Sequence, residues 1–192
     1  MDPINDTPNP SESLPHSRAR LTGLVYLSYF VTGISGMYLA HHGLAAYGHA
    51  LNFFPNMVYA ALAVLLYFLL APVSKGVSLL AACFGFAGCV VAGLGIYNLI
   101  SARISPLLCF GPYCILLGYL IFKSTFLPRA IGVLMMVAGA AWLVSLLPQL
   151  AKPAFPYVAG LGIVAEAALM LWLLIKGVDE QRWKQRAIGG SI

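Results

Sequence analysis

Six apolar runs dominate this chain, and short segments with proline, glycine or charged residues separate them. The runs cover residues 21–46, 54–70, 77–100, 104–122, 130–147 and 155–175. About 20 helical residues cross the apolar part of a bilayer, so each run predicts a membrane-spanning helix. Only 11 Lys and Arg and 6 Asp and Glu occur among 192 residues, which excludes a soluble globular domain, a disordered protein and a secreted disulfide scaffold. We therefore predict an all-α integral membrane protein, a bundle of six transmembrane helices with short loops.

The sequence divides into a membrane domain and two polar tails. Residues 1–20 contain several prolines and no periodic apolar face, which predicts a disordered cytoplasmic tail. Residues 21–178 form the predicted six-helix transmembrane domain, and residues 179–192 form a basic cytoplasmic tail. Because the first apolar run is too long for a signal peptide, we expect it to remain in the protein as an anchor.

Lys and Arg are distributed unevenly between the two sides that six spans would create. One side holds nine of them, namely Arg18, Arg20, Lys75, Lys123, Arg129, Lys176, Arg182, Lys184 and Arg186. The other side holds Arg103 and Lys152. Cytoplasmic loops of membrane proteins collect Lys and Arg, so we expect both termini in the cytoplasm and the protein in the cytoplasmic (inner) membrane. The same bias accounts for the net charge of +5 without a nucleic-acid partner.

Small residues occur four apart in two of the runs. Gly85, Cys89 and Gly93 recur along the third run, and Ser28, Thr32 and Gly36 along the first. Residues four apart share one face of a helix, and small faces let helices approach closely in lipid. We predict that both faces are helix-packing surfaces of a compact bundle. A substrate path lined by the Ser and Thr hydroxyls is the alternative.

Glu166 is the single acidic residue within the runs, and it lies near the middle of the last one. A charge at the bilayer centre costs about 2.5–3.5 kcal/mol on insertion scales, so we expect a neutral or strongly hydrogen-bonded carboxyl group. No Lys or Arg lies within the runs to pair with it. Two interpretations stay open: a proton or cation site, or a protonated carboxyl group bonded to a hydroxyl or carbonyl of another helix.

Three histidines, His41, His42 and His49, cluster where the first run ends, on the predicted non-cytoplasmic face. Imidazoles bind zinc and copper, and a single His can ligate a haem or a pigment. No Cys or carboxylate lies nearby in the sequence, and the spacing matches no metal motif. We therefore predict no cofactor, with solvated imidazoles here, and keep haem, pigment or metal ligation as the alternative.

Three stretches resemble a known family: RLTGLVYLSYFVTGISG at residues 20–36, CILLGYLIFKSTFLPRAIGVLMMVAGAAWL at 114–143 and EAALMLWLLIKGV at 166–178. The family is a group of bacterial multi-pass membrane proteins catalogued as domain of unknown function 4386. The resemblance implies six or seven membrane helices and no established activity. It also implies a carboxylate at Glu166, a His where this chain has Tyr113, and Arg and Gln within residues 84–89, which here read FGFAGC. The chain is thus similar to a short member that lacks several polar core residues.

The sequence supports three hypotheses about function. No HExxH, GxSxG or Walker motif occurs, so an enzyme is the least favoured class. The leading hypothesis is a non-catalytic accessory or scaffold subunit that packs in a larger membrane assembly, with the lipid bilayer and other membrane subunits as partners. The second is a small proton-coupled transporter or channel-like protein that uses Glu166. The third is cofactor ligation by His41, His42 and His49 at the outer face.

Overall fold

The computed structural model describes residues 14–42, 45–101, 105–144 and 146–189, and within them it contains seven helices and no strand. The helices are α1 (Leu14–His41), α2 (Ala45–Leu70), α3 (Lys75–Ile96), α4 (Leu107–Lys123), α5 (Arg129–Val144), α6 (Pro148–Ile175) and α7 (Glu180–Gly189). The prediction of an all-α fold is confirmed.

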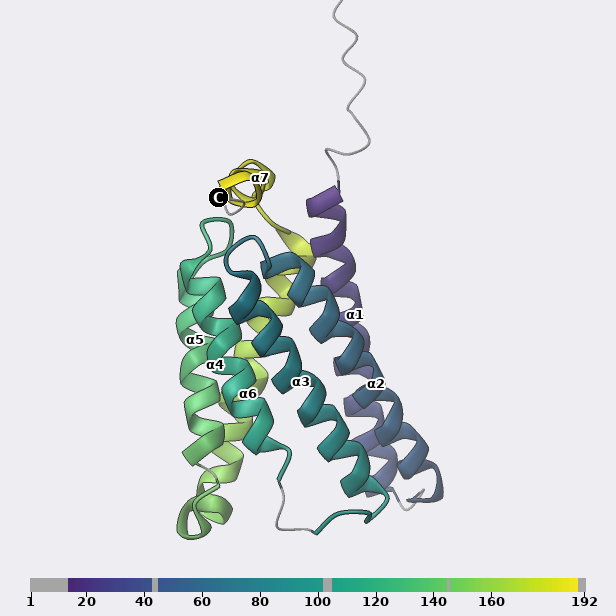
Figure 1. Cartoon of the computed structure of the whole chain (residues 1–192). Coiled ribbons are helices and arrows are strands. Elements are labelled where there is room, and N and C mark those ends of the chain that lie inside the picture. Colours follow the sequence, from purple (N-terminus) through teal and green to yellow (C-terminus); the bar gives the residue numbers. More distant parts are fainter. Residues whose placement is uncertain (1–13, 43–44, 102–104, 145, 190–192) are drawn as a thin grey trace, which may run out of the picture.

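The first six helices form a closed ring, in which each helix packs against the next along the chain and α6 packs against α1 (Figure 1). Consecutive helices run in opposite directions, so the start of α1 and the end of α6 lie together at one end of the bundle, which we call the terminal end. Helix α7 lies across this end. The ends of α1, α3 and α5 and the starts of α2, α4 and α6 lie at the other end, which we call the distal end (Figure 1).

Three helices are long and apolar enough to cross a membrane, over Phe53–Leu70, Lys75–Ile96 and Lys152–Ile175. Helices α4 and α5 are apolar but shorter, with 17 and 16 residues. Helix α1 has 28 residues, but its first turns are polar, so its apolar part is shorter than the whole helix. The six predicted apolar runs therefore all become helices, and three of these helices have the length and hydropathy of membrane spans.

Several helix ends differ from the sequence-based boundaries. Helix α1 begins at Leu14, inside the segment expected to be a disordered tail; within that segment Ala19 is fully buried. Helix α2 begins at Ala45 and contains Pro55, where we expected the run to start. Helix α6 begins at Pro148, which we expected to end the preceding run. Proline fits the first turn of a helix because the N–H that it lacks has no partner there.

Reciprocal glycine contacts join α4 and α5. A Cβ atom on Gly118 would lie 2.5 Å from the Gly132 carbonyl oxygen, and one on Gly132 would lie 2.7 Å from the Gly118 carbonyl oxygen. Two helical turns later on α5, a Cβ atom on Gly139 would lie 2.7 Å from the Gly111 carbonyl oxygen. The two backbones touch at both levels, which only residues without a Cβ atom allow.

The face of α3 that carries the small residues Gly85, Cys89 and Gly93 lies inside the ring. Gly85 is buried, and a Cβ atom there would lie 3.2 Å from both Ala63 and Tyr113. Cys89 is also buried, and its carbonyl oxygen accepts a hydrogen bond of 2.6 Å from Asn56 of α2. A Cβ atom on Gly93 would lie 3.4 Å from the Asn56 amide nitrogen. Small residues on this face therefore lie where α3 meets α2 and α4.

The small face of α1 is divided between the interior and the surface. Gly36 is buried, whereas Ser28 is exposed. The Ser28 hydroxyl donates to the Val25 carbonyl at 2.7 Å, and the Thr32 hydroxyl donates to the Ser28 carbonyl at 2.7 Å. Both hydroxyls thus bond to their own helix, as Ser and Thr commonly do within membrane helices.

Helix α7 is fastened to the terminal end by side chains that donate to free carbonyl groups. The Trp183 indole N–H donates to the Leu69 carbonyl at 2.9 Å. The Arg182 and Arg186 guanidinium groups donate to the Thr125 and Lys123 carbonyls at 3.1 and 3.3 Å. The last carbonyls of a helix lack partners and carry partial negative charge, so cationic donors stabilise them. Helix α7 therefore covers the ends of α2 and α4.

Candidate functional site

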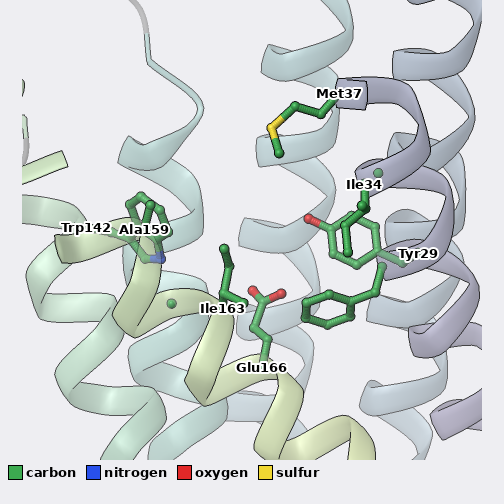
Figure 2. Close-up of a pocket in the computed structure, with 10 residues that line it drawn as sticks. Tyr29, Ile34, Met37, Trp142, Ala159, Ile163 and Glu166 are labelled. Atoms are coloured by element: carbon green, nitrogen blue, oxygen red, sulfur yellow. The ribbon is translucent and has the colours of Figure 1, made fainter. Parts of the chain in front are cut away.

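Glu166 lies on α6 and borders two cavities inside the distal half of the ring. The first, which we call the Glu166 cavity, has a volume of about 340 Å³ and lies between α1, α5 and α6. Figure 2 shows the Glu166 carboxyl group directed into it, between Ile163 and Tyr29, with Met37 on the far side. The second, which we call the inner cavity, has a volume of about 190 Å³ and is bordered by α1, α2, α4, α5 and α6. Because Glu166 is only partly buried and borders both cavities, its exposed part faces this space.

Tyrosines from three other helices surround the carboxyl group. The Tyr59 hydroxyl of α2 donates to Glu166 Oε1 at 3.2 Å. Tyr29 of α1 borders both cavities, and its ring meets the Tyr59 ring edge-on at 4.8 Å. The hydroxyls of Tyr26 and Tyr113 are buried nearby, where Tyr26 interacts with the Glu166 carboxyl group and Tyr113 with Tyr59. The site is therefore a carboxyl group surrounded by phenol groups, of which Tyr59 donates the hydrogen bond with resolved geometry.

No basic side chain is close to Glu166 in the part of the chain that the structure describes. None of the residues that border the two cavities is Lys, Arg or His. A third cavity, of about 300 Å³, continues from Tyr59 and Phe110 towards the distal end and is also free of basic residues. A carboxylate in such surroundings lacks the opposite charge that would stabilise it, so its charge must be balanced by a proton or by a cation that enters.

Two glycines, which lack side chains, shape the Glu166 cavity. Gly162 lies one turn before Glu166, and a Cβ atom there would lie 2.6 Å from the Trp142 ring. The indole of Trp142 can therefore lie directly against α6, where it forms one wall. Gly33 of α1 borders the same cavity, and a Cβ atom there would meet nothing within 4 Å. A larger residue at position 33 would extend into open space.

The ring is tightly packed on the terminal side of Glu166. Its interior there is filled by fully buried apolar side chains from α2, α4, α5 and α6: Leu62, Leu66, Leu70, Leu117, Leu120, Ile121, Met135, Leu169 and Leu173. The buried hydroxyls of Ser78 and Ser124 donate to the carbonyls of Tyr67 and Ile121. This packing and helix α7 above it separate the cavities from the terminal end.

The two described members of the predicted histidine cluster, His41 and His42, border none of these cavities. His41 and His42 are exposed at the end of α1, and their ring centres lie 5.7 Å apart. The side chain of His49 lies outside the described residues. Among described residues, no group of three His, Cys, Asp or Glu side chains could hold a metal ion. The exposed Ser28 hydroxyl borders none of the three cavities, and neither does Thr32.

Comparison with known proteins places the chain in a family. Residues 103–177 match the family described as Domain of unknown function (DUF4386). An uncharacterized protein of Archaeoglobus fulgidus is 32% identical over 122 residues, which cover 60% of this chain and 74% of the relative. The chain belongs to the DUF4386 family. The resemblance inferred from the sequence is thereby confirmed. No solved structure matches the chain.

The DUF4386 match covers α4, α5 and α6, and so includes Trp142, Gly162 and Glu166. Sequence reasoning singled out Glu166 but missed the aromatic residues around it. Tyr29 and Tyr59 lie well inside apolar runs rather than at their ends, where interfacial tyrosines collect. That position is the signal that could have identified them, because a phenol deep in a membrane helix needs a polar neighbour.

Proposed function

We propose that this DUF4386 protein is a multi-pass membrane protein whose six helices α1–α6 all cross the bilayer, with both termini on the cytoplasmic side. The uneven distribution of Lys and Arg supports this orientation, and the terminal end carries Lys75, Lys123, Arg129 and the basic residues of α7. Helices α4 and α5 are short for a bilayer, but local thinning of the membrane accommodates a short span at modest free-energy cost. The cavities then open towards the non-cytoplasmic half.

We further propose that Glu166 binds and releases a proton there, which is the central step of a small proton-coupled carrier. The observation that carries the proposal is the position of the carboxyl group on the wall of a cavity of about 340 Å³, without a basic neighbour among the described residues. A carboxyl group that only joined helices would be enclosed by the groups that bond it. Here the Tyr59 hydroxyl donates to Oε1, and the carboxyl group also borders open space.

The open side of the Glu166 cavity supports this proposal. Ile34, Met37 and Ile163 border the cavity and are more than half exposed, so a proton carrier or ligand can reach the carboxyl group without displacing buried side chains. The expected role as an accessory or scaffold subunit remains a hypothesis, and the cavities support the transport alternative more directly.

A carbodiimide reaction tests the proton site. Dicyclohexylcarbodiimide modifies protonated carboxyl groups in apolar surroundings, and Glu166 is the one acidic residue within α1–α6. We expect peptide mass spectrometry of the full chain in lipid to locate the adduct at Glu166. The yield should fall as the pH rises, because fewer carboxyl groups then carry a proton.

Glu166→Gln is the matched control, because it keeps the size of the side chain and removes the reactive group. We expect this variant to fold and to show no adduct in α6. An unmodified Glu166 over the whole pH range in which the protein stays folded would indicate a sealed structural carboxyl group and contradict the proposal.

A further inference from the structure

We propose that the Glu166 cavity binds an organic ammonium ion with an apolar body, which exchanges with the proton on Glu166. This inference rests on the proton site proposed above and names the ligand class of that site. Three features of the cavity support it: its single negative group, its aromatic walls and its opening between α1 and α6.

The charge balance of the site selects for a cation. Glu166 is the acidic residue of the cavity, and Lys, Arg and His are absent from the residues that border it. An anion would meet an uncompensated carboxylate, and a neutral ligand would leave the carboxyl group protonated. A monovalent cation instead forms a neutral pair with the ionised group inside a medium of low polarity.

The walls select an organic cation over a metal ion. Tyr29, Phe30 and Trp142 border the cavity with Glu166, and Tyr59 and Phe110 continue the aromatic surface into the inner cavity. Aromatic faces attract ammonium groups, and they do so most strongly when the cation has lost its water. Hard metal ions take about six or more oxygen ligands, which this wall of rings and aliphatic side chains does not offer.

The opening between α1 and α6 selects a ligand with an apolar body. Ile34 and Met37 of α1 and Ile163 of α6 border the cavity while being 61%, 71% and 57% exposed. The cavity therefore reaches the outer surface of the ring through an aliphatic rim (Figure 2). In a membrane this rim faces lipid, so an amphiphilic amine can enter sideways from the bilayer with its apolar part against the rim.

Proton and ammonium ion compete for one carboxylate, so binding depends on pH. The other titratable groups that interact with Glu166 are phenols and one thiol on α1, α2 and α4: Tyr26, Tyr29, Tyr59, Tyr113 and Cys114. On α5, the side chain that borders the cavity is the non-titrating Trp142. Affinity should therefore rise with pH, by up to about tenfold per pH unit, because one proton leaves for each cation bound.

The experiment compares benzyltrimethylammonium with neopentylbenzene, its neutral isostere, on the full chain in lipid nanodiscs. Binding is measured by calorimetry and by protection of Glu166 from carbodiimide modification. We expect the wild-type protein to bind the cation at least about tenfold more tightly than the isostere, because only the cation gains the carboxylate and the ring faces. Glu166→Gln should remove that preference.

Two glycines give a matched pair of control variants. Gly33→Leu places a side chain in open space within the cavity and should reduce binding of the cation at least about tenfold by excluding it. Gly160→Leu adds the same side chain to an exposed position on α6 with nothing within 4 Å, and should leave binding unchanged.

The outcomes separate this inference from the proton site. Equal affinity for the cation and its isostere, or an unchanged cation affinity in Glu166→Gln, would overturn the inference in favour of an apolar lipid site. If carbodiimide modifies Glu166 in a pH-dependent way but the cation neither binds nor protects, the inference fails and the proton site stands. If Glu166 is never modified and no cation binds, both proposals fail.

Discussion

The two halves of the six-helix ring are built from the same kinds of apolar sequence but are packed differently. In the terminal half, leucine side chains such as Leu66, Leu117 and Leu169 are at most 2% exposed and fill the interior. In the distal half, the interior holds large aromatic rings and the Glu166 carboxyl group, with cavities of about 340 and 190 Å³ between them. The aliphatic side chains of the terminal half are closely packed, as in other protein cores, whereas the rings of the distal half border the cavities.

This difference distinguishes a half that stabilises the fold from a half that can bind a ligand. The terminal half holds the helices together, and α7 closes it through the Trp183 bond to the Leu69 carbonyl. The distal half has fewer packing contacts around the Glu166 carboxyl group, which is costly to bury. Binding sites commonly lie in such less stable regions of a protein, which can open without loss of the remaining fold.

The largest expected effect compares Leu169→Ala in the packed half with Ile163→Ala at the cavity rim, both on α6. Leu169 is fully buried, and we expect its truncation to destabilise the fold by about 2–3 kcal/mol, the lower part of the Leu→Ala range because the unfolded helix stays in lipid. Ile163 is 57% exposed, and its truncation should cost less than about 0.5 kcal/mol. Reversible unfolding in mixed micelles measures both. Equal losses would show that the two halves are equally packed.

A smaller loss of stability is expected from a substitution at Gly162, against which the Trp142 wall of the cavity lies. Gly162→Ala places a Cβ atom 2.6 Å from the Trp142 ring, so the indole must move and the fold should lose about 1–2 kcal/mol. Gly160→Ala, on the same helix with nothing within 4 Å, is the control and should be nearly neutral. Thermal unfolding of both variants in one detergent makes the comparison. If Gly162→Ala leaves the stability unchanged, Trp142 is not tightly packed against α6.

The smallest effect concerns the hydrogen bond between Tyr59 and Glu166, whose atoms lie 3.2 Å apart. Tyr59→Phe removes the phenol donor and should destabilise the fold by about 0.6 kcal/mol, the typical size of an intramembrane hydrogen bond. The carboxylate also loses the Tyr59 donor, so the carbodiimide adduct should persist to higher pH than in the wild-type protein. Unfolding and adduct yield are both measured on this variant. An unchanged pH profile would indicate that water, not Tyr59, stabilises the charge.

Much of the fold could be predicted from the order of apolar and polar residues. The six runs became helices α1–α6, because the length of an apolar run and the proline or glycine that ends it are local properties. Helix ends were less predictable, since α1 continues back to Leu14 and α2 continues through Pro55. These extensions depend on contacts such as the burial of Ala19, which no local pattern reports.

The site was predicted only in part. Glu166 is conspicuous in the sequence because a carboxyl group inside an apolar run is rare. Tyr59 lies 107 residues away from it along the chain, and its bond to Glu166 depends on how the ring closes. The glycines of α4 were also missed as a packing surface, because the close approach of Gly111 and Gly118 to α5 depends on how the two helices pack against each other.

The sequence by itself determined that this chain forms apolar helices, that its basic residues favour one side and that one carboxyl group lies within them, since hydropathy and charge belong to each residue wherever the chain is placed. The tertiary structure alone decided that α6 closes the ring against α1 and that the distal half stays hollow around Glu166. Cavities depend on the shapes of side chains from different helices, such as Trp142 lying against Gly162, and those shapes meet only after the helices have packed.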